Sequence, residues 1–438
     1  MDKLHVLEEL KNYRQKKPIR LHMPGHKGIL PDEFLSIAEL DVTELNNIQI
    51  IQAVQKAQTD IAKIYGADYC KLISNGSTGG ILSMVHAVKN LGDKIIINRT
   101  AHQSVYNAIE LCDLEPIILD KPTVEETKRA IEENPSAIGA LFTYPDYFGE
   151  KFDIKGVKAL LKKHGKLLLI DNAHGAHVKF TDTESYAGEF ADVWADSAHK
   201  TLPTLNQGAM LFCANSKLIH LVDSSSKIFA TTSPSYPILA SIEYGVKYMA
   251  QTWKEIRQAF SSWRNDFKTL LELLGIKVKD YGDVFKLTLD FSPLGINAFD
   301  VEKSLNENGV YPELTDSNNI LLMFSVQTAK SEFNKTYNAI KRTLDSIKQK
   351  KQTDTEEDVE SLLAERVIPY LTAIKSEFEY VKLKSAVGRV CAINTGVFPP
   401  CYPVLTAGEK ITAKAVEILK KSEYTFGLND GKIKVVKE

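Results

Sequence analysis

Short apolar runs alternate with longer amphipathic segments between about residues 66 and 215. The apolar runs predict buried strands at 94–98, 115–119, 138–144, 167–171 and 192–195. Between them, one predicted helix opens at 123–126 with capping-box spacing and another covers 154–163. Strands that are buried on both faces and separated by helices predict a mainly parallel sheet in an α/β fold. Ligands of such sheets bind beyond the carboxyl ends of the strands.

The remaining pattern divides the chain. We expect an N-terminal segment over 1–40, a large domain over 41–275 and a smaller C-terminal domain over 276–438. A long helical pattern at about 235–274 can bridge the last two. The stretch 349–360 is charged and free of aromatic residues, which predicts an exposed connection. Near the C-terminus we expect a strand at 389–393 and a rigid proline-rich loop at 398–403.

Composition excludes several classes of protein. Apolar residues make up 44% of the 438 residues, as in ordinary globular proteins. The 54 basic and 56 acidic residues give a net charge of −2, so the basic excess of a nucleic-acid-binding protein is missing. Five scattered cysteines predict neither a disulfide framework nor a zinc ribbon. Without a signal peptide or a run of ~20 apolar residues, we expect a cytoplasmic protein with no membrane partner.

A lysine follows the predicted strand at 192–195, in the string Ser197-Ala198-His199-Lys200. Lysine forms Schiff bases once burial or nearby cations lower the pKa of its amine. Standing alone, such a string is more often a surface loop. A second candidate is Asp171, at the carboxyl end of an apolar strand. It could cap a helix, form a buried salt bridge, or hold the protonated nitrogen of a pyridine ring.

Two weaker candidates precede these. The stretch 74–80 (SNGSTGG) is rich in glycine and hydroxyl groups and leads into a helical pattern, which predicts a capped turn or a phosphate cup. It matches neither the dinucleotide fingerprint nor the P-loop. His102, after the strand at 94–98, could be a structural hydrogen-bonding residue or lie flat on an aromatic ligand. A metal site at His174 and His177 lacks further residues with ligand spacing.

The order of these candidates favours one cofactor. A glycine-rich anion cup, a histidine, an aspartate at a strand end and a Ser-x-His-Lys string follow one another over about 125 residues. Pyridoxal phosphate (PLP) needs each of them: a phosphate cup, a stacking group, a partner for its ring nitrogen and an imine lysine. We therefore expect PLP, and no metal, as the cofactor.

The sequence resembles the Orn/Lys/Arg decarboxylase family, in a small form. The resemblance rests on the string LHMPGHKG at 21–28, the cofactor motifs named above in the same order, and C-terminal motifs at 388–389, 399–400 and 408–412. It covers nearly the whole chain. It implies a fold type I large domain, as in aspartate aminotransferase, with a smaller α+β C-terminal domain, and decarboxylation of lysine, arginine or ornithine in polyamine metabolism.

The resemblance also implies roles for single residues. Lys200 would be the Schiff-base lysine, Asp171 the partner of the ring nitrogen, and His102 the stacking residue. His174 would lie near the imine or the substrate carboxylate, and Ala173 would pack on the other ring face. The phosphate would contact Ser77, Thr78, Ser197 and His199. The segment 231–236, with Ser233 and Ser235, would reach into the neighbouring subunit of a homodimer with shared active sites.

Some residues depart from the family pattern where the substrate's side chain should bind. Ile393 stands where an acid is expected, Cys401 alters a proline-rich loop, and Asp146 could supply the missing charge. Two alternatives therefore remain open. One is a PLP enzyme with another reaction, such as transamination, or with an altered substrate. The other is a non-catalytic regulatory or interaction protein, which the presence of Lys200 and Asp171 disfavours.

Overall fold

A computed structural model describes residues 3–43, 49–346, 364–397, 402–422 and 424–437. Its central feature is a seven-stranded sheet in the order β1-β7-β6-β5-β4-β2-β3. The strands are Tyr69–Ile73, Lys94–Asn98, Glu115–Leu119, Ala137–Thr143, Leu167–Asp171, Val193–Asp196 and Ala209–Cys213. Within this sheet β7 pairs antiparallel with both of its neighbours, and all other pairs are parallel. The predicted α/β fold with a mainly parallel sheet is confirmed.

Local sequence explains why these elements form. Strands β2, β3 and β5 have the predicted bounds, and α7 (Ile154–Lys163) does too. Helix α6 (Val124–Glu133) begins after Thr123, whose Oγ1 accepts the N–H of Glu126 at 3.1 Å. In a full capping box, the Glu126 side chain would also accept the N–H of Thr123. Here it accepts the N–H of Lys121 at 3.3 Å instead. One half of the predicted cap is therefore present.

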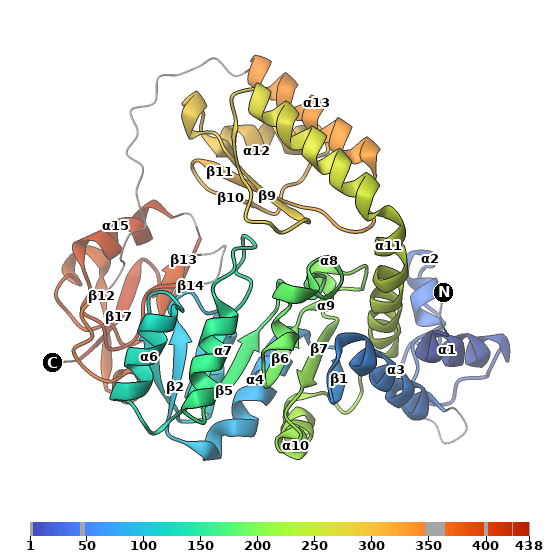
Figure 1. Ribbon diagram of the computed structural model, residues 1–438, viewed down its shortest axis with the longest axis horizontal. Coiled ribbons are helices and arrows are strands. Elements are labelled where there is room, and N and C mark those ends of the chain that lie inside the picture. The colour runs from blue at the N-terminus through green and yellow to red at the C-terminus, as the bar shows by residue number, and fades with distance from the viewer. Residues whose placement is uncertain (1–2, 44–48, 347–363, 398–401, 423, 438) are drawn as a thin grey trace.

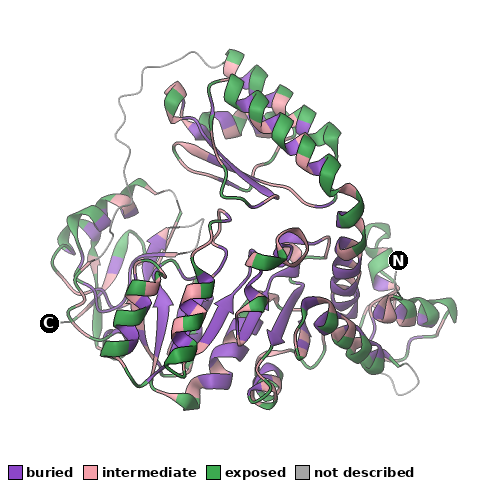
Figure 2. Cartoon of the chain, in the orientation of Figure 1, coloured by how far each residue is buried: buried purple, intermediate pink, exposed green. Residues whose placement is uncertain are grey.

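Alternating residues of each strand supply two separate apolar layers. On one face, Ile95 and Ile97 pack with α4 (Gly76–Val88), α5 (Gln103–Leu111), α10 (Ile219–Phe229) and α14 (Tyr370–Lys375). On the other face, Ile96 packs with α3 (Ile50–Tyr65), α6, α7 and α11 (Tyr236–Leu273). Figure 2 shows the strands buried between these helices. This arrangement leaves the strand ends as the place where polar groups gather.

Helix α11 connects distant parts of the chain. Near its start, buried Glu243 accepts the backbone N–H groups of His5 at 2.8 Å and Val6 at 2.9 Å, at the beginning of α1 (His5–Gln15). Lys247, one turn later, donates to Glu243 at 3.0 Å. The N-terminal segment is thus held by charge and hydrogen bonds as well as by apolar packing. The N-terminal segment also contains helix α2 (Asp32–Ala38).

After α11 the chain forms an antiparallel sheet of four strands in the order β10-β11-β9-β8. The strands are Lys277–Lys279, Lys286–Asp290, Leu314–Thr315 and Asn319–Met323, and α12 (Ala298–Glu307) and α13 (Lys330–Ser346) pack with them. We call residues 277–346 the four-stranded part. Figure 1 shows it across from α8 (Val178–Thr181) and α9 (Ala198–Thr201). This part therefore faces the end of the seven-stranded sheet where β5 and β6 finish.

The C-terminal part, residues 364–437, has two three-stranded sheets, β12-β17-β16 and β14-β13-β15. Their strands are Phe378–Lys382, Thr395–Val397, Tyr402–Leu405, Thr425–Phe426, Leu428–Asn429 and Lys432–Val436, and α15 spans Ala413–Lys421. A buried ion pair between Arg99 and Glu409 ties this part to the end of β2. Such a pair leaves an uncompensated buried charge if one partner is removed.

Several C-terminal expectations need correction or lie outside the described residues. The predicted strand at 389–393 is wrong: Val390 and Cys391 form only isolated bridges, because each pairs with a different neighbour. The predicted loop at 398–403 ends in strand β14, and its first four residues lie outside the described part, as does the connection at 349–360. Among the described residues, none of the helices is both long and apolar enough to cross a bilayer.

Candidate active site

The glycine-rich stretch forms the start of α4. Gly76 has a φ of +76°, a conformation that favours glycine, and its N–H donates to the carbonyl of Gln207 at 2.9 Å. Ser77 and Thr78 follow in the first helical turn, where backbone N–H groups lack helical acceptors. Ser197, at the end of β6, donates its hydroxyl proton to Ser77 Oγ at 2.7 Å. Hydroxyl and N–H donors therefore converge at a helix N-terminus, which suits a phosphate.

Lys200 lies on the short helix α9, directly after β6, and is only partly accessible. Its Nζ lies 3.0 Å from His174 Nε2. Burial lowers the pKa of Lys200, while the nearby Asp171 carboxylate opposes this change. The lysine can thus reach its unprotonated, nucleophilic form more easily than a surface lysine.

Asp171 occupies the carboxyl end of β5 and is 1% exposed. Its Oδ1 accepts the N–H of Ala173 at 3.1 Å. Burial raises the pKa of Asp171, and the electrostatic effects of His102 and Lys200 oppose this. Within the described part of the chain it forms no ion pair at salt-bridge distance. A cationic ring nitrogen placed against this carboxylate would supply the compensation that a buried charge needs.

Two histidines flank these groups. His102 is the N-cap of α5, and its Nδ1 accepts the N–H of Ser104 at 3.1 Å, which fixes the ring. His174 is buried, and burial together with Lys200 holds its pKa well below the usual range. A neutral His174 accepts the Lys200 N–H at Nε2, and its Nδ1 has no partner among the described residues. An orphaned buried nitrogen beside the lysine fits a site built for a further polar ligand.

The structure does not bring all candidates together. His199 Nδ1 donates to the carbonyl of Gly208 at 2.9 Å, which orients the ring beside Lys200. Ser233 and Ser235 lie in the turn before α11, where the N–H of Ser233 donates to Thr231 Oγ1 at 3.1 Å. No described contact joins either serine to the cup or to Lys200 of the same chain.

The two histidines of the alternative metal site have different partners. His174 Nε2 lies against Lys200, whereas His177 Nε2 donates to Asp283 Oδ1 at 2.8 Å. Asp283 comes from the turn before β9, far along the chain. The pair is therefore divided between the active lysine and a contact with the four-stranded part.

The site includes Tyr147, which lies against His174, and Glu313, which contacts Tyr147, although neither stands out in the sequence. The Tyr147 ring lies against the His174 ring with centroids 4.7 Å apart, and its hydroxyl donates to Glu313 Oε1 at 2.6 Å. Glu313 is exposed and precedes β10. No motif marks it, since the fold joins it to the site from another sheet. Asp146, the acid that the sequence suggested, has its Oδ1 occupied by the N–H groups of Phe148 and Glu150 at 2.9 and 2.7 Å.

A buried polar network supports the ends of β5 and β6. Asp196 accepts hydrogen bonds from Asn172 Nδ2 at 2.6 Å and from the Tyr186 hydroxyl at 3.1 Å. Burial raises the pKa of Asp196 to about 8, so the group is mostly protonated at neutral pH. From the sequence alone, an aspartate at the end of a strand is consistent with a supporting role like that of Asp196 and with the cofactor-binding role expected of Asp171. Only their different surroundings in the fold distinguish them.

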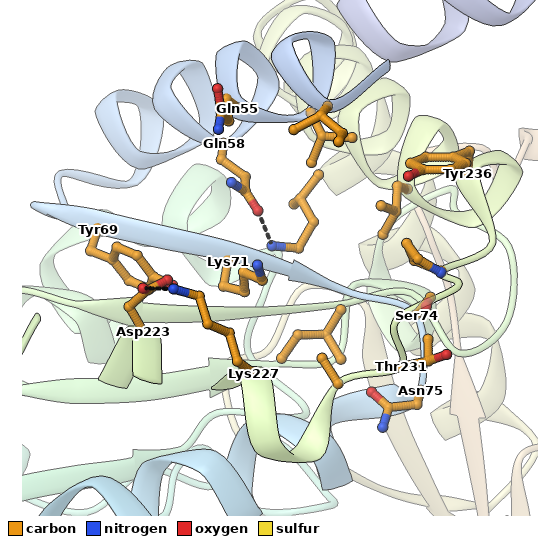
Figure 3. A pocket seen from close by; sticks show the side chains of 17 residues that line it. Gln55, Gln58, Tyr69, Lys71, Ser74, Asn75, Asp223, Lys227, Thr231 and Tyr236 are labelled. Atoms are coloured by element: carbon orange, nitrogen blue, oxygen red, sulfur yellow. Dashed lines mark hydrogen bonds and ion pairs between the residues drawn. The ribbon is translucent and has the colours of Figure 1, made fainter. Parts of the chain in front are cut away.

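A separate hollow of about 400 Å³ lies between α3, β1 and the start of α11. Figure 3 shows Lys71, Gln58 and Thr231 around it. Ser74 and Asn75, which lead into the cup, also line it, together with Pro234 of the segment 231–236. Lys200 and Asp171 are not among its lining residues. The hollow thus adjoins the back of the cup without being the site of the reactive lysine.

The chain is similar in sequence to a known protein family. The family model described as "Orn/Lys/Arg decarboxylase, major domain" matches residues 6–280. An arginine decarboxylase of Bacillus subtilis (strain 168) is 30% identical over 455 aligned positions, covering 94% of this chain and 92% of that protein.

Solved structures show the same fold. The constitutive lysine decarboxylase of E. coli superposes with a TM-score of 0.79 at 19% identity, covering 99% of this chain and 82% of that one. A structure described as SPT with PLP gives a TM-score of 0.59 at 14% identity, covering 73% and 85% of the two chains. The expected fold type I architecture is therefore confirmed.

Proposed function

The chain belongs to the Orn/Lys/Arg decarboxylase family, and we propose that it uses PLP to remove the α-carboxylate of a basic amino acid as CO2. The observation that carries this proposal is the meeting of Lys200, His174 and Asp171 beside the cup of Ser77 and Ser197. These groups come from three separate segments of the chain: the start of α4, the end of β5 with the loop after it, and α9 with its N-cap. Their convergence supports a built active site.

The residues present suit PLP. The hydroxyls of Ser77, Thr78 and Ser197 and the first turn of α4 would hold the phosphate, with His199 nearby. Buried Asp171 lacks an ion-pair partner within the described residues and would bind the protonated ring nitrogen. His102 and Ala173 would cover the two ring faces, and Lys200 would bond to the cofactor aldehyde. Bound PLP would supply an electron sink for the bond that breaks at Cα.

The chain's own groups would then manage the protons. The Asp171 carboxylate would keep the proton on the ring nitrogen, because removing it would leave a buried negative charge unpaired. Lys200 and the neutral His174 lie 3.0 Å apart, so either can pass a proton to the other. As CO2 leaves, one proton from this pair would be delivered to Cα. The product would be the corresponding primary amine.

Mass spectrometry of products tests this function. The purified protein with added PLP would be incubated with a panel of amino acids that includes lysine, arginine and ornithine. We expect one of these three to lose the mass of CO2 and gain a proton at Cα. A keto-acid product with the carboxylate retained would support an aminotransferase instead. No product from the whole panel would contradict an enzymatic role.

We also propose that Glu313 receives the distal cation of the substrate. A continuous row of contacts runs from Lys200 through His174 and the Tyr147 ring to Glu313. A substrate whose α-amine is bound at Lys200 could extend its side chain along this row. The exposed Glu313 carboxylate is fixed by the Tyr147 hydroxyl, so it is better placed than the turn-bound Asp146 to replace the acid expected at Ile393.

Replacing Glu313 by glutamine should mainly weaken substrate binding. A hydrogen bond to a charged group contributes about 1.5–3 kcal/mol, so KM should rise roughly 10- to 100-fold while kcat changes little. Steady-state kinetics with the preferred amino acid would measure both constants. Glu150→Gln, a substitution of an exposed acid beside the Asp146 turn, serves as the matched control. An equal rise of KM in both variants, or in neither, would refute this role of Glu313.

We further propose a homodimer with shared active sites. Ser233 and Ser235 lie beside the hollow that adjoins the cup, yet no described contact joins them to the Lys200 site of their own chain. Exposed apolar side chains of the N-terminal segment provide a surface that a second copy would cover: Ile19, Leu21, Met23, Ile29, Phe34 and Ile37. The partner's segment 231–236 would then complete the phosphate site.

Subunit mixing tests the shared site. A Lys200→Ala chain would be mixed with a chain carrying Ser233→Ala and Ser235→Ala, each inactive as a homodimer. After full exchange at equal amounts about half of the dimers are mixed, and one of the two sites in each mixed dimer carries neither defect. Roughly a quarter of all sites should therefore regain activity. Mass spectrometry would first verify that the subunits have exchanged. If activity does not recover after verified exchange, the serines act within one chain.

We propose a cytoplasmic location and a role in polyamine metabolism on chemical grounds. Cys70, Cys213 and Cys391 are buried and free of disulfides, as suits a reducing compartment. Decarboxylation of a basic amino acid yields a compound with at least two basic groups. Such a product is a precursor for polyamines.

A further inference from the structure

A buried hydrogen bond joins the four-stranded part to the loop that carries His174. This loop covers residues 172–177, between β5 and α8, and we call it the histidine loop. Its last residue, His177, donates from Nε2 to Asp283 Oδ1 at 2.8 Å, and the two side chains are 0% and 1% exposed. Asp283 lies in the turn before β9, 106 residues further along the chain. The bond is thus shielded from water and connects two parts of the fold.

The histidine loop is wound tightly between its two ends. At its start, the side chain of Asn172 donates to the carboxylate at the end of β6 at 2.6 Å. The N–H of Gly175 then donates to the carbonyl oxygen of Asn172 at 2.9 Å, and the N–H of Val178 donates to that of Gly175 at 3.0 Å. His174 lies inside the first of these two turns. A displacement at the far end of the loop would therefore be passed on to His174.

Asp283 also contacts the segment 145–149, which lies on the other side of His174. Gly149 has a φ of +96°, and an added Cβ there would lie 2.6 Å from Asp283 Cβ. Two residues earlier, the Tyr147 ring lies against the His174 ring with centroids 4.7 Å apart. Asp283 therefore touches both the loop that carries His174 and the segment that packs on its ring.

The four-stranded part and α11 hold Asp283 from their own side. Its Oδ1 also accepts the N–H of Phe285 at 2.9 Å. The Phe285 ring lies against the His177 ring with centroids 5.0 Å apart. From α11, Arg264 donates to the carbonyl oxygens of Asp283 at 3.1 Å and of Lys286 at 3.0 Å. The histidine loop is thus attached to a carboxylate whose backbone and side chain both have fixed partners.

We propose that Asp283 is a positioning residue for His174. By holding His177, it keeps the histidine loop in the conformation that places His174 Nε2 3.0 Å from Lys200 Nζ. Among the described residues, Asp283 forms no hydrogen bond with His174 or Lys200, so it acts through the loop. The same four-stranded part carries Glu313, and its docking would set both ends of the substrate site together. The inference rests on the proposed role of His174, but the position of the loop can be measured without cofactor or turnover.

Acylation of histidine rings by diethyl pyrocarbonate tests the inference in the purified full chain without added PLP. Mass spectrometry would give the labelling rate of His174, which is 6% exposed, relative to that of the exposed His164. Asp283→Ala removes the acceptor of the buried bond, so the histidine loop should open more often. The relative rate at His174 should then rise roughly 5-fold or more. An unchanged rate in a folded Asp283→Ala protein would overturn the proposal.

Variants of the second partner test whether the effect runs through this one contact. His177→Ala should raise the His174 rate as Asp283→Ala does, and it replaces that variant if Asp283→Ala does not fold. His177→Gln keeps an N–H donor near the Nε2 position and should restore much of the protection. The double alanine variant should label no faster than either single variant, because both changes remove the same bond. Additive increases would show that the two residues act separately and would contradict the proposal.

Asp290 offers a matched control in the same sheet. It is a buried carboxylate at the end of β9 and pairs with Lys279 at 3.1 Å. Asp290→Ala also removes an ion pair of the four-stranded part, but it should leave the His174 rate unchanged. A rise equal to that of Asp283→Ala would mean that the labelling reports general loosening of this part, and the positioning role would be refuted.

Turnover assays separate this inference from the proposed function. If the wild type releases CO2, Asp283→Ala should lower kcat by roughly 10- to 100-fold, the effect of a misplaced proton-transfer group. In a His174→Ala background the same substitution should have little further effect on kcat. Faster labelling of His174 in a protein that decarboxylates no amino acid would support the loop account and refute the proposed function. Decarboxylation with an unchanged labelling rate would support the function and refute the positioning role.

Discussion

Replacing Lys200 by methionine should reduce turnover by roughly 10⁴-fold or more, because the amine is expected both to bond to the cofactor and to transfer a proton. Proton transfer by a positioned side chain alone contributes about 10²–10⁴-fold. Methionine has a similar length, so the short helix α9 should keep its packing. Release of CO2 from the preferred amino acid would measure the loss, and circular dichroism would verify the fold.

Lys200→Arg distinguishes the amine from its charge. Arginine preserves a cation near Asp171 but remains protonated and cannot act as a nucleophile. We therefore expect Lys200→Arg to be as inactive as Lys200→Met. Substantial activity in the arginine variant would mean that Lys200 serves only as a counter-charge.

Asp171→Asn should lower kcat by roughly 10²–10⁴-fold, since breaking a buried charge pair costs about 3–5 kcal/mol. Asparagine keeps the shape of the side chain and can still accept the N–H of Ala173, but it cannot stabilise a protonated ring nitrogen. The variant should retain part of its PLP through the phosphate contacts of Ser77 and Ser197. Absorbance of bound PLP and CO2 release would be measured on the same samples.

Asp196 offers the matched control. It is also buried at a strand end, but its pKa of about 8 means that it is already mostly neutral at pH 7. Asp196→Asn should therefore retain most of the activity at that pH. Because the folded pKa is raised above the usual value near 3.8, this group makes the wild type lose stability as pH rises from about 4 to about 8. The variant should lack that slope, and equal losses of activity in both variants would contradict the distinct role of Asp171.

The sequence could predict those residues of the site that stand next to a recognisable strand or helix. Lys200, Asp171 and the cup at Ser77 each follow a strand or precede a helix, so their placement at one sheet edge follows from the α/β pattern. The strands at 94–98 and 167–171 are equally clear, because both faces of these strands are buried.

Other features depend on contacts between distant segments. Glu313 and Asp283 precede strands of a second sheet, and no local motif signals that they contact Tyr147 and His177. The predicted strand at 389–393 failed for a similar reason: Val390 and Cys391 each pair singly with a different distant neighbour rather than along a ladder. The pattern of apolar residues alone could not distinguish a strand from a pair of isolated bridges.

The most direct test of the central claim is the site of covalent attachment in the wild-type protein. The protein with added PLP would be reduced with borohydride, digested, and its peptides identified by mass spectrometry. The account predicts a phosphopyridoxyl group on Lys200 and a loss of activity in proportion to labelling. Modification of another lysine, or none at all, would contradict it.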